Sequence, residues 1–155
     1  MDGENTIEAC QRVTSDTLQA VFAALYDHRV TLEGMLLKPN MVIAGKGCPV
    51  QNSTEKVAKA TVRTFLQVVP AAVPGIVFLS GGQSPELATA HLDAMNRLGH
   101  FPWELSFSYG RALQAPTLQA WSGNPSQVPE AQALYLKRAK LNGAARYGQY
   151  AASME

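Results

Sequence analysis

At residues 75–86 the chain reads Gly75-Ile76-Val77-Phe78-Leu79-Ser80-Gly81-Gly82-Gln83-Ser84-Pro85-Glu86, and this stretch decides the fold. Its first six residues are almost continuously apolar, which is typical of a strand buried on both faces in a parallel sheet. After the glycine pair, Ser84 can cap a helix with Pro85 and an acid in its first turn, predicted to run to about Leu98. A buried strand that leads directly into a helix predicts an α/β fold.

The segments on either side continue this order of elements. Apolar residues recur at steps of three and four from Asn5 to His28, which is the period of an amphipathic helix. A short apolar run that Pro39 stops has the form of a strand, and Asn52 is predicted to cap a second helix, with Glu55 at capping-box spacing. Helices are thus predicted over 5–28, 52–69, 84–98, 113–121 and 129–146, and strands over 30–37, 75–80 and 103–109.

The alternation of helices and strands implies right-handed crossovers between parallel strands. Three parallel strands alone leave an unpaired edge on each side, so we expect them to be part of a larger sheet or a closed barrel. With 155 residues, the chain is long enough for one core and too short for two ordinary domains. Residues 1–155 are therefore predicted to form a single domain, or a piece of one.

Composition and charge argue against several classes of protein. Thirteen Lys and Arg against twelve Asp and Glu give a formal net charge of +1, too balanced for a general attraction to nucleic acid or to an anionic membrane surface. The longest apolar stretches fall short of the ~20 residues that a membrane-spanning helix needs. The acidic start, Met1–Glu4, lacks the features of a secretory signal. We therefore expect a cytoplasmic protein with no nucleic-acid or membrane partner.

Lys38 stands where the first predicted strand gives way to a loop, in Leu36-Leu37-Lys38-Pro39-Asn40. Alternation along the strand places it on the same face as Gly34 and Leu36. A lysine at a strand end commonly extends its ammonium group to water. The alternative is a desolvated amine whose pKa is low enough for a neutral nucleophile that attacks a carbonyl. The local sequence leaves both interpretations open.

Two further strand ends carry polar groups. Ser80-Gly81-Gly82 follows the second strand, where the glycines either serve a tight turn or offer backbone N–H groups to a phosphate. Ser108-Tyr109-Gly110-Arg111 follows the third, where the guanidinium either pairs with a surface carboxylate or donates two parallel hydrogen bonds to a phosphate. Polar groups at three strand ends favour a site, because α/β barrels and open sheets build their sites there.

Taken together, the three strand-end motifs resemble the sixth, seventh and eighth strands of class I fructose-bisphosphate aldolases in order and spacing. The motifs are Leu32–Val42, Phe78–Ser84 and Phe107–Gln114. The resemblance runs from about Asp2 to Tyr150 and includes the connecting helices. It implies a partial (β/α)8 TIM barrel that comprises helix 5 and strands 6 to 8 with their helices, which is the C-terminal half of the family's domain.

The resemblance also implies the Schiff-base chemistry of this family. Lys38 would form an imine with the ketone of fructose 1,6-bisphosphate, which would be cleaved reversibly to dihydroxyacetone phosphate and glyceraldehyde 3-phosphate in glycolysis. No metal and no organic cofactor would be needed, and the protein would form a homo-oligomer, a tetramer in the family. The C1 phosphate of this sugar would be held by Ser80, Gly81, Gly82, Ser108, Gly110 and Arg111.

The resemblance covers only part of the family's catalytic machinery. Earlier strands of the family supply an aspartate, a second lysine and a glutamate that transfer protons around the imine. A Glu-Pro-Glu strand precedes the family segment that Asp2-Gly3 matches, so Met1 is either the true start or an internal methionine of a full enzyme. We therefore keep a second hypothesis, a truncated and catalytically incompetent chain that at most binds a phosphosugar or serves as a structural half-barrel.

Overall fold

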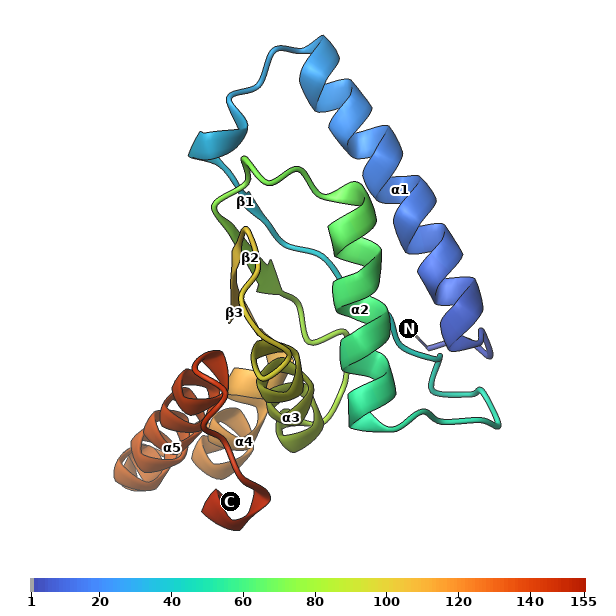
Figure 1. Ribbon diagram of the computed structural model, residues 1–155. Helices are drawn as coiled ribbons and strands as arrows, with labels where there is room; N and C mark the ends of the chain where they lie inside the picture. The colour runs from blue at the N-terminus through green and yellow to red at the C-terminus, as the bar shows by residue number, and fades with distance from the viewer. Residues whose placement is uncertain (1) are drawn as a thin grey trace.

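The computed structural model describes residues 2–155, and its helices and strands are shown in Figure 1. The predicted alternation of helices with parallel strands is confirmed, since each strand is followed by a helix. In chain order the elements are α1 (Ile7–Asp27), the 3-10 helix η1 (Leu32–Gly34), β1 (Leu36–Leu37), α2 (Thr54–Val68), β2 (Gly75–Phe78), α3 (Pro85–Asn96), β3 (Glu104–Phe107), α4 (Arg111–Trp121), η2 (Pro125–Gln127), α5 (Val128–Arg146) and η3 (Ala152–Met154).

The three strands form one parallel sheet in the order β1-β2-β3. Ile76 of β2 pairs with Leu37 on one side and with Leu105 on the other. The pairing continues past the end of β1, where Leu79 N donates to Pro39 O at 3.0 Å. Within residues 2–155, β1 and β3 are the two edges of the sheet. The sequence-based expectation of a parallel sheet is therefore confirmed.

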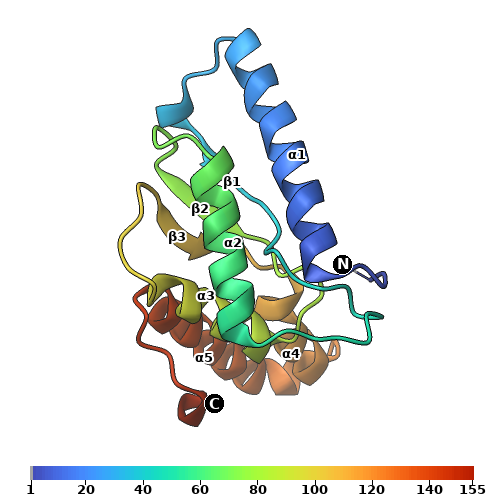
Figure 2. The same cartoon turned by 45° about the vertical axis from the view of Figure 1, so that its right-hand side comes forward.

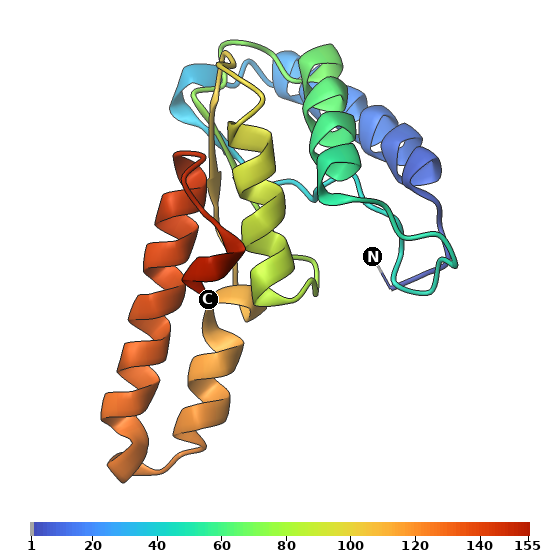
Figure 3. The same ribbon diagram turned by 60° about the horizontal axis from the view of Figure 1, so that its bottom comes forward.

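The sheet has a buried face and an open face. Leu37, Ile76 and Leu105 point to the same face and are buried, and Phe65 of α2 stacks on Phe78 of β2 with ring centroids 5.8 Å apart. Leu36 points the other way, because side chains alternate along a strand, and it is 61% exposed. Helices α3 and α5 both contact β3, and α2 packs against α1 and α3 (Figures 2 and 3). The core therefore lies between the sheet and these helices.

The first strand is shorter than predicted. Residues 32–34, which were expected to be extended, form η1, in which Gly34 N and Met35 N donate to the carbonyls three residues earlier. This turn buries Leu32 in the core. Only Leu36–Leu37 remains as β1. The third strand is also trimmed, from the expected 103–109 to Glu104–Phe107.

Serine and threonine side chains cap the first three helices. Thr6 Oγ1 accepts from Ala9 N in α1, and Ser84 caps α3 as predicted. The cap of α2 is Ser53 instead of the predicted Asn52, because Ser53 has the extended backbone of an N-cap and its hydroxyl accepts from the N–H three residues on. Several boundaries also shift by one or two residues, with α3 ending at Asn96, α4 starting at Arg111 and α5 starting at Val128.

Candidate functional site

The three segments predicted to form the site lie at the carboxyl end of the sheet, where the three strands finish. Lys38 directly follows β1, Ser80 follows β2 after one residue, and Ser108 directly follows β3. Because β1 and β3 both pair with β2 in parallel, the carboxyl ends of the three strands point the same way. The structure thus brings the three predicted segments together as neighbours.

Lys38 is exposed, and its alternation from Leu36 places it on the open face of the sheet. Of the two interpretations of this lysine, one requires a desolvated amine. Residues 2–155 do not themselves provide such an environment, because Lys38 and its same-face neighbour Leu36 are both exposed. An amine in this position is accessible to a small carbonyl compound.

The loop that follows Lys38 is fixed by polar contacts to two helices. The side-chain amide of Asn40 donates to Thr14 Oγ1 of α1 at 3.1 Å, and to the carbonyl of Met41 at 2.9 Å. Val42 N donates to Thr61 Oγ1 of α2 at 2.9 Å. Buried backbone groups need such partners. These contacts therefore hold the loop in place, and with it the backbone of Lys38.

The glycine pair after β2 adopts a conformation that requires glycine. Gly81 and Gly82 have φ angles of 58° and 79°, in the left-handed region where a Cβ would be strained. The turn is closed by Gln83 N, which donates to Ser80 O at 3.1 Å. Ser80 itself is 4% exposed and is packed in the protein, whereas the two glycines are partly exposed.

A buried histidine, which no sequence motif singles out, supports this turn. His91 of α3 is 1% exposed and its Nδ1 lies 2.6 Å from Gln83 Oε1. The amide nitrogen of Gln83 donates to Ser80 O at 3.0 Å and contacts Met41 Sδ at 3.4 Å, so its oxygen is the acceptor and His91 Nδ1 carries the proton. Burial lowers the pKa of His91 to about 4, which keeps the ring neutral.

Two cationic side chains converge on the glycine turn. A Cβ atom added to Gly82 would lie 3.2 Å and 3.4 Å from the terminal nitrogens of Arg111, and 2.8 Å from Lys46 Nζ. Arg111 begins α4, and the N-cap of that helix, Gly110, provides no side-chain hydrogen bond to its first turn. The predicted neighbours Gly82 and Arg111 are thus in contact. Lys46 was not predicted, although its glycine-flanked place in Gly45-Lys46-Gly47 was the available signal.

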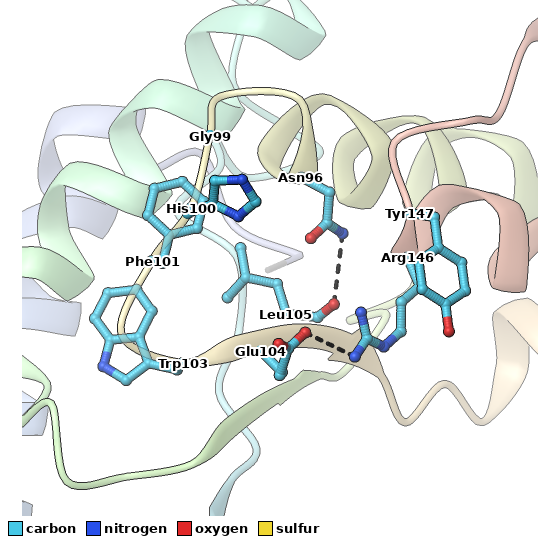
Figure 4. A pocket seen from close by; sticks show the side chains of 9 residues that line it. All are labelled: Asn96, Gly99, His100, Phe101, Trp103, Glu104, Leu105, Arg146 and Tyr147. Atoms are coloured by element: carbon cyan, nitrogen blue, oxygen red, sulfur yellow. Dashed lines mark hydrogen bonds and ion pairs between the residues drawn. The ribbon is translucent and has the colours of Figure 1, made fainter.

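A small pocket lies beside this turn. It has a volume of about 150 Å³ and is lined by Lys46, Gly81, Gly82, Ser84 and residues of the loop before α2. A larger pocket of about 420 Å³ lies at the opposite end of the sheet, around the start of β3 (Figure 4). There Arg146 donates to Glu104 at 2.7 Å. The small pocket is the one that adjoins the predicted site.

Two other structural features bear on function. No helix in residues 2–155 is both long and apolar enough to cross a membrane. In the same range, no three His, Cys, Asp or Glu side chains are grouped so that they could hold a metal ion.

Comparison with protein families decides what kind of protein carries this site. The family model described as "Glycolytic: Fructose-bisphosphate aldolase class-I" matches residues 1–155, the full length of the chain. The chain belongs to the class I fructose-bisphosphate aldolase family. The resemblance inferred from the three strand-end motifs is therefore confirmed.

Individual aldolases agree with this assignment. The chain is 53% identical over 150 residues to fructose-bisphosphate aldolase of Dictyostelium discoideum, covering 97% of this chain and 42% of that protein. It is 54% identical over 153 residues to fructose-bisphosphate aldolase B of Gallus gallus, again covering 42% of the relative. A solved structure of fructose-bisphosphate aldolase from Plasmodium falciparum, in complex with TRAP and a small-molecule inhibitor, matches with a TM-score of 0.95 and 50% identity, over 97% of this chain and 44% of that one. The chain thus spans less than half the length of these aldolases.

Proposed function

We propose that this chain carries the Schiff-base lysine and the C1-phosphate site of a class I fructose-bisphosphate aldolase. The reaction is the reversible cleavage of fructose 1,6-bisphosphate to dihydroxyacetone phosphate and glyceraldehyde 3-phosphate, in glycolysis and in the cytoplasm. The observation that supports this most directly is the meeting of three strand ends, which brings an accessible lysine and a glycine turn flanked by two cations to the carboxyl end of the sheet in a chain of this family.

In this proposal Lys38 attacks the C2 ketone of the sugar as a neutral amine. Loss of water gives a protonated imine, which accepts the electron pair of the C3–C4 bond when the C4 hydroxyl loses its proton. Glyceraldehyde 3-phosphate leaves with its new aldehyde, and the enamine that stays on Lys38 is protonated at C3. Hydrolysis then releases dihydroxyacetone phosphate and regenerates the amine, so no metal or organic cofactor enters the balance.

The C1 phosphate is held by the glycine turn and by the start of α4. Backbone N–H groups of Gly81 and Gly82 are unencumbered by side chains, and Ser80 anchors the turn. Ser108 and Gly110 lead into α4, whose first turn lacks a side-chain cap and can therefore donate to an anion. Arg111 places its guanidinium over Gly82, where its fork suits a phosphate.

For the architecture, we propose a sector of a (β/α)8 barrel that comprises strands 6 to 8 of the family's fold, with helix 5 before them. The two unpaired edges of the parallel sheet and its open face support this proposal, because a closed barrel would pair the edges and fill that face with side chains from other strands. A homo-oligomer, a tetramer by analogy with the family, is part of the same proposal.

A second candidate function is the binding of a phosphosugar without catalysis. The exposure of Lys38 favours it, since residues 2–155 do not desolvate the amine. In the family, as the resemblance implies, an aspartate, a second lysine and a glutamate from earlier strands transfer protons at the imine. Without a partner in proton transfer, rates typically fall about 10²–10⁴-fold.

Borohydride trapping separates these two functions. The 155-residue chain is incubated with dihydroxyacetone phosphate and sodium borohydride, and peptide mass spectrometry locates any reduced adduct. Imine chemistry predicts an adduct on Lys38 that is absent from Lys38→Arg, because arginine stays protonated and forms no imine.

Lys59 serves as the internal control for this trapping experiment. It is also exposed, but its Nζ is paired with Glu55 on the surface of α2. Comparable labelling of Lys38 and Lys59 would indicate non-specific reaction with lysines, and no adduct on Lys38 at millimolar ligand would refute imine formation by this chain.

A further inference from the structure

We propose that Lys46 is a second phosphate-binding cation, which shares the anion on the glycine turn with Arg111 and competes for it with Asp2. This inference rests on the proposed function and adds to it a residue that no strand-end motif contains. Lys46 lies in the loop between β1 and α2, eight positions after Lys38 in the sequence.

The ammonium group of Lys46 lies beside the glycine turn. Lys46 Nζ and the guanidinium of Arg111 both lie within 3.4 Å of the point where a Cβ of Gly82 would stand. Glycine leaves this point free, so an anion seated on the turn would lie between the two cations. Because two cations and the backbone N–H groups of the turn then surround one point, the site suits a dianion such as a phosphate monoester.

The backbone on either side of Lys46 is fixed by hydrogen bonds to the N-terminal segment. Gly45 N donates to Asn5 O at 2.8 Å and Gly47 N donates to Gly3 O at 3.0 Å. A Cβ on Gly45 would lie 2.0 Å from Gly3 O, so only glycine permits this approach. Figure 1 shows the N-terminal segment beside the loop before α2.

A side-chain contact completes the support of this loop. Gln51 Nε2 donates at 2.9 Å to the carbonyls of both Gly45 and Cys48. The loop is thus held from both sides, and Lys46 is presented to the pocket from a rigid position, which reduces the ordering entropy that binding would otherwise cost.

Asp2 supplies a competing anion, because its carboxylate is the group that Lys46 contacts when no ligand is present. Asp2 Oδ1 lies 3.4 Å from Lys46 Nζ, and both side chains are largely exposed. A bound phosphate and this carboxylate therefore compete for the same ammonium group. Removing the charge of Asp2 is expected to free Lys46 for the phosphate, whereas removing Lys46 leaves Arg111 as the cation at Gly82.

The test is a titration of the 15N-labelled chain with inorganic phosphate, followed by the amide shifts of Gly81 and Gly82. Lys46→Gln is expected to weaken binding about fivefold to tenfold, and Asp2→Asn to tighten it about twofold to threefold, as for a partly screened charge. Lys56→Gln is the matched control, since Lys56 is 53% exposed against 55% for Lys46 and is also paired with one carboxylate, that of Glu8 at 3.2 Å. The control should bind phosphate like the unmodified chain.

Arg111→Gln separates a failure of this inference from a failure of the proposed function. If Arg111→Gln weakens phosphate binding while Lys46→Gln binds like the unmodified chain, the phosphate site stands and the role of Lys46 is overturned. If the unmodified chain shifts neither glycine amide, the phosphate site itself is refuted. Equal weakening by Lys46→Gln and Lys56→Gln would indicate an effect of net charge and would also overturn the proposal.

Discussion

His91 supports the glycine turn from within the core while its own ring stays neutral. Its Nδ1–H donates to Gln83, and its Nε2 has no hydrogen-bond partner among the described residues. Protonation would place a charge at this buried nitrogen, which explains the lowered pKa of about 4. The side chain thus couples the geometry of the glycine turn to its own protonation state.

The pH dependence of stability should report on His91. Below pH 6.5 the unfolded chain binds a proton that the folded chain excludes, so the free energy of unfolding should fall from pH 6.5 to about 4. The full difference between these pKa values corresponds to about 3 kcal/mol. His91→Asn should flatten this part of the curve, measured by urea unfolding at several pH values.

The matched variant at an exposed position is His28→Asn. It serves as the control because it replaces a surface histidine and leaves the buried ring of His91 unchanged. A curve for His91→Asn that follows the unmodified chain between pH 6.5 and 4 would contradict the role of His91.

At the scale of elements, α2 holds the loop that carries the site residues. Thr61 Oγ1 donates to Val57 O within the helix at 2.8 Å and accepts from Val42 N at 2.9 Å. Thr64, one turn on, is equally buried but only donates to Ala60 O at 2.8 Å within its own helix. The two threonines therefore differ in one respect, the support of a loop N–H group.

Thr61→Val should destabilise the chain more than Thr64→Val does. The first variant leaves Val42 N–H buried without an acceptor, at a cost of about 1–3 kcal/mol. The second removes a donor whose carbonyl partner stays in the helix ladder, and should cost less than about 1 kcal/mol. Chemical unfolding of the two variants measures the difference, and equal losses would show that the loop does not depend on α2 for this N–H group.

At the scale of the whole molecule, Arg138 joins α5, α3 and the tail after α5. It is 4% exposed, its Nη1 contacts both carboxylate oxygens of Glu155 at 2.6 Å, and its Nη2 donates to Pro85 O at 2.9 Å. Tyr150 donates to Glu155 Oε1 at 3.0 Å. Figure 3 shows the tail returning from the end of α5 toward α3. The N-terminal end of α3, next to the glycine turn, is thus tied to the last helix.

Arg138→Met should destabilise the chain by about 1.5–3 kcal/mol, because it removes a buried guanidinium that donates charged hydrogen bonds to Glu155 and to Pro85 O. Arg146→Met is the control, since the pair of Arg146 with Glu104 is much more exposed and should contribute at most about 1 kcal/mol. Thermal unfolding of both variants is the measurement. Similar midpoints for the two variants would mean that Arg138 does not hold the tail and α3 together.

The local pattern of the sequence was enough to predict the helices and strands and the three strand-end segments of the candidate site. Continuous apolar residues in 75–80, the serine cap at Ser84 and the helical periods all act between neighbouring residues, so they can be read without knowledge of the fold. The family could be inferred for the same reason, because its motifs are contiguous. The boundaries of β1 and the N-cap of α2 were predicted incorrectly. The burial of Leu32 and the extended backbone conformation of Ser53 both depend on tertiary packing.

Only the tertiary structure decided which groups meet. Lys46 and Arg111 are 65 positions apart in the sequence, and they converge on Gly82 because the loop before α2 and the start of α4 approach the same turn. The burial of His91 and the exposure of Lys38 depend likewise on which face of the sheet and of α3 is covered. A sequence pattern describes spacing along the chain, whereas solvation and charge pairing depend on distances in space. For that reason the glycine turn, the lysine and the arginine could be predicted one by one, while the approach of Lys46 and Arg111 to the glycine turn could not.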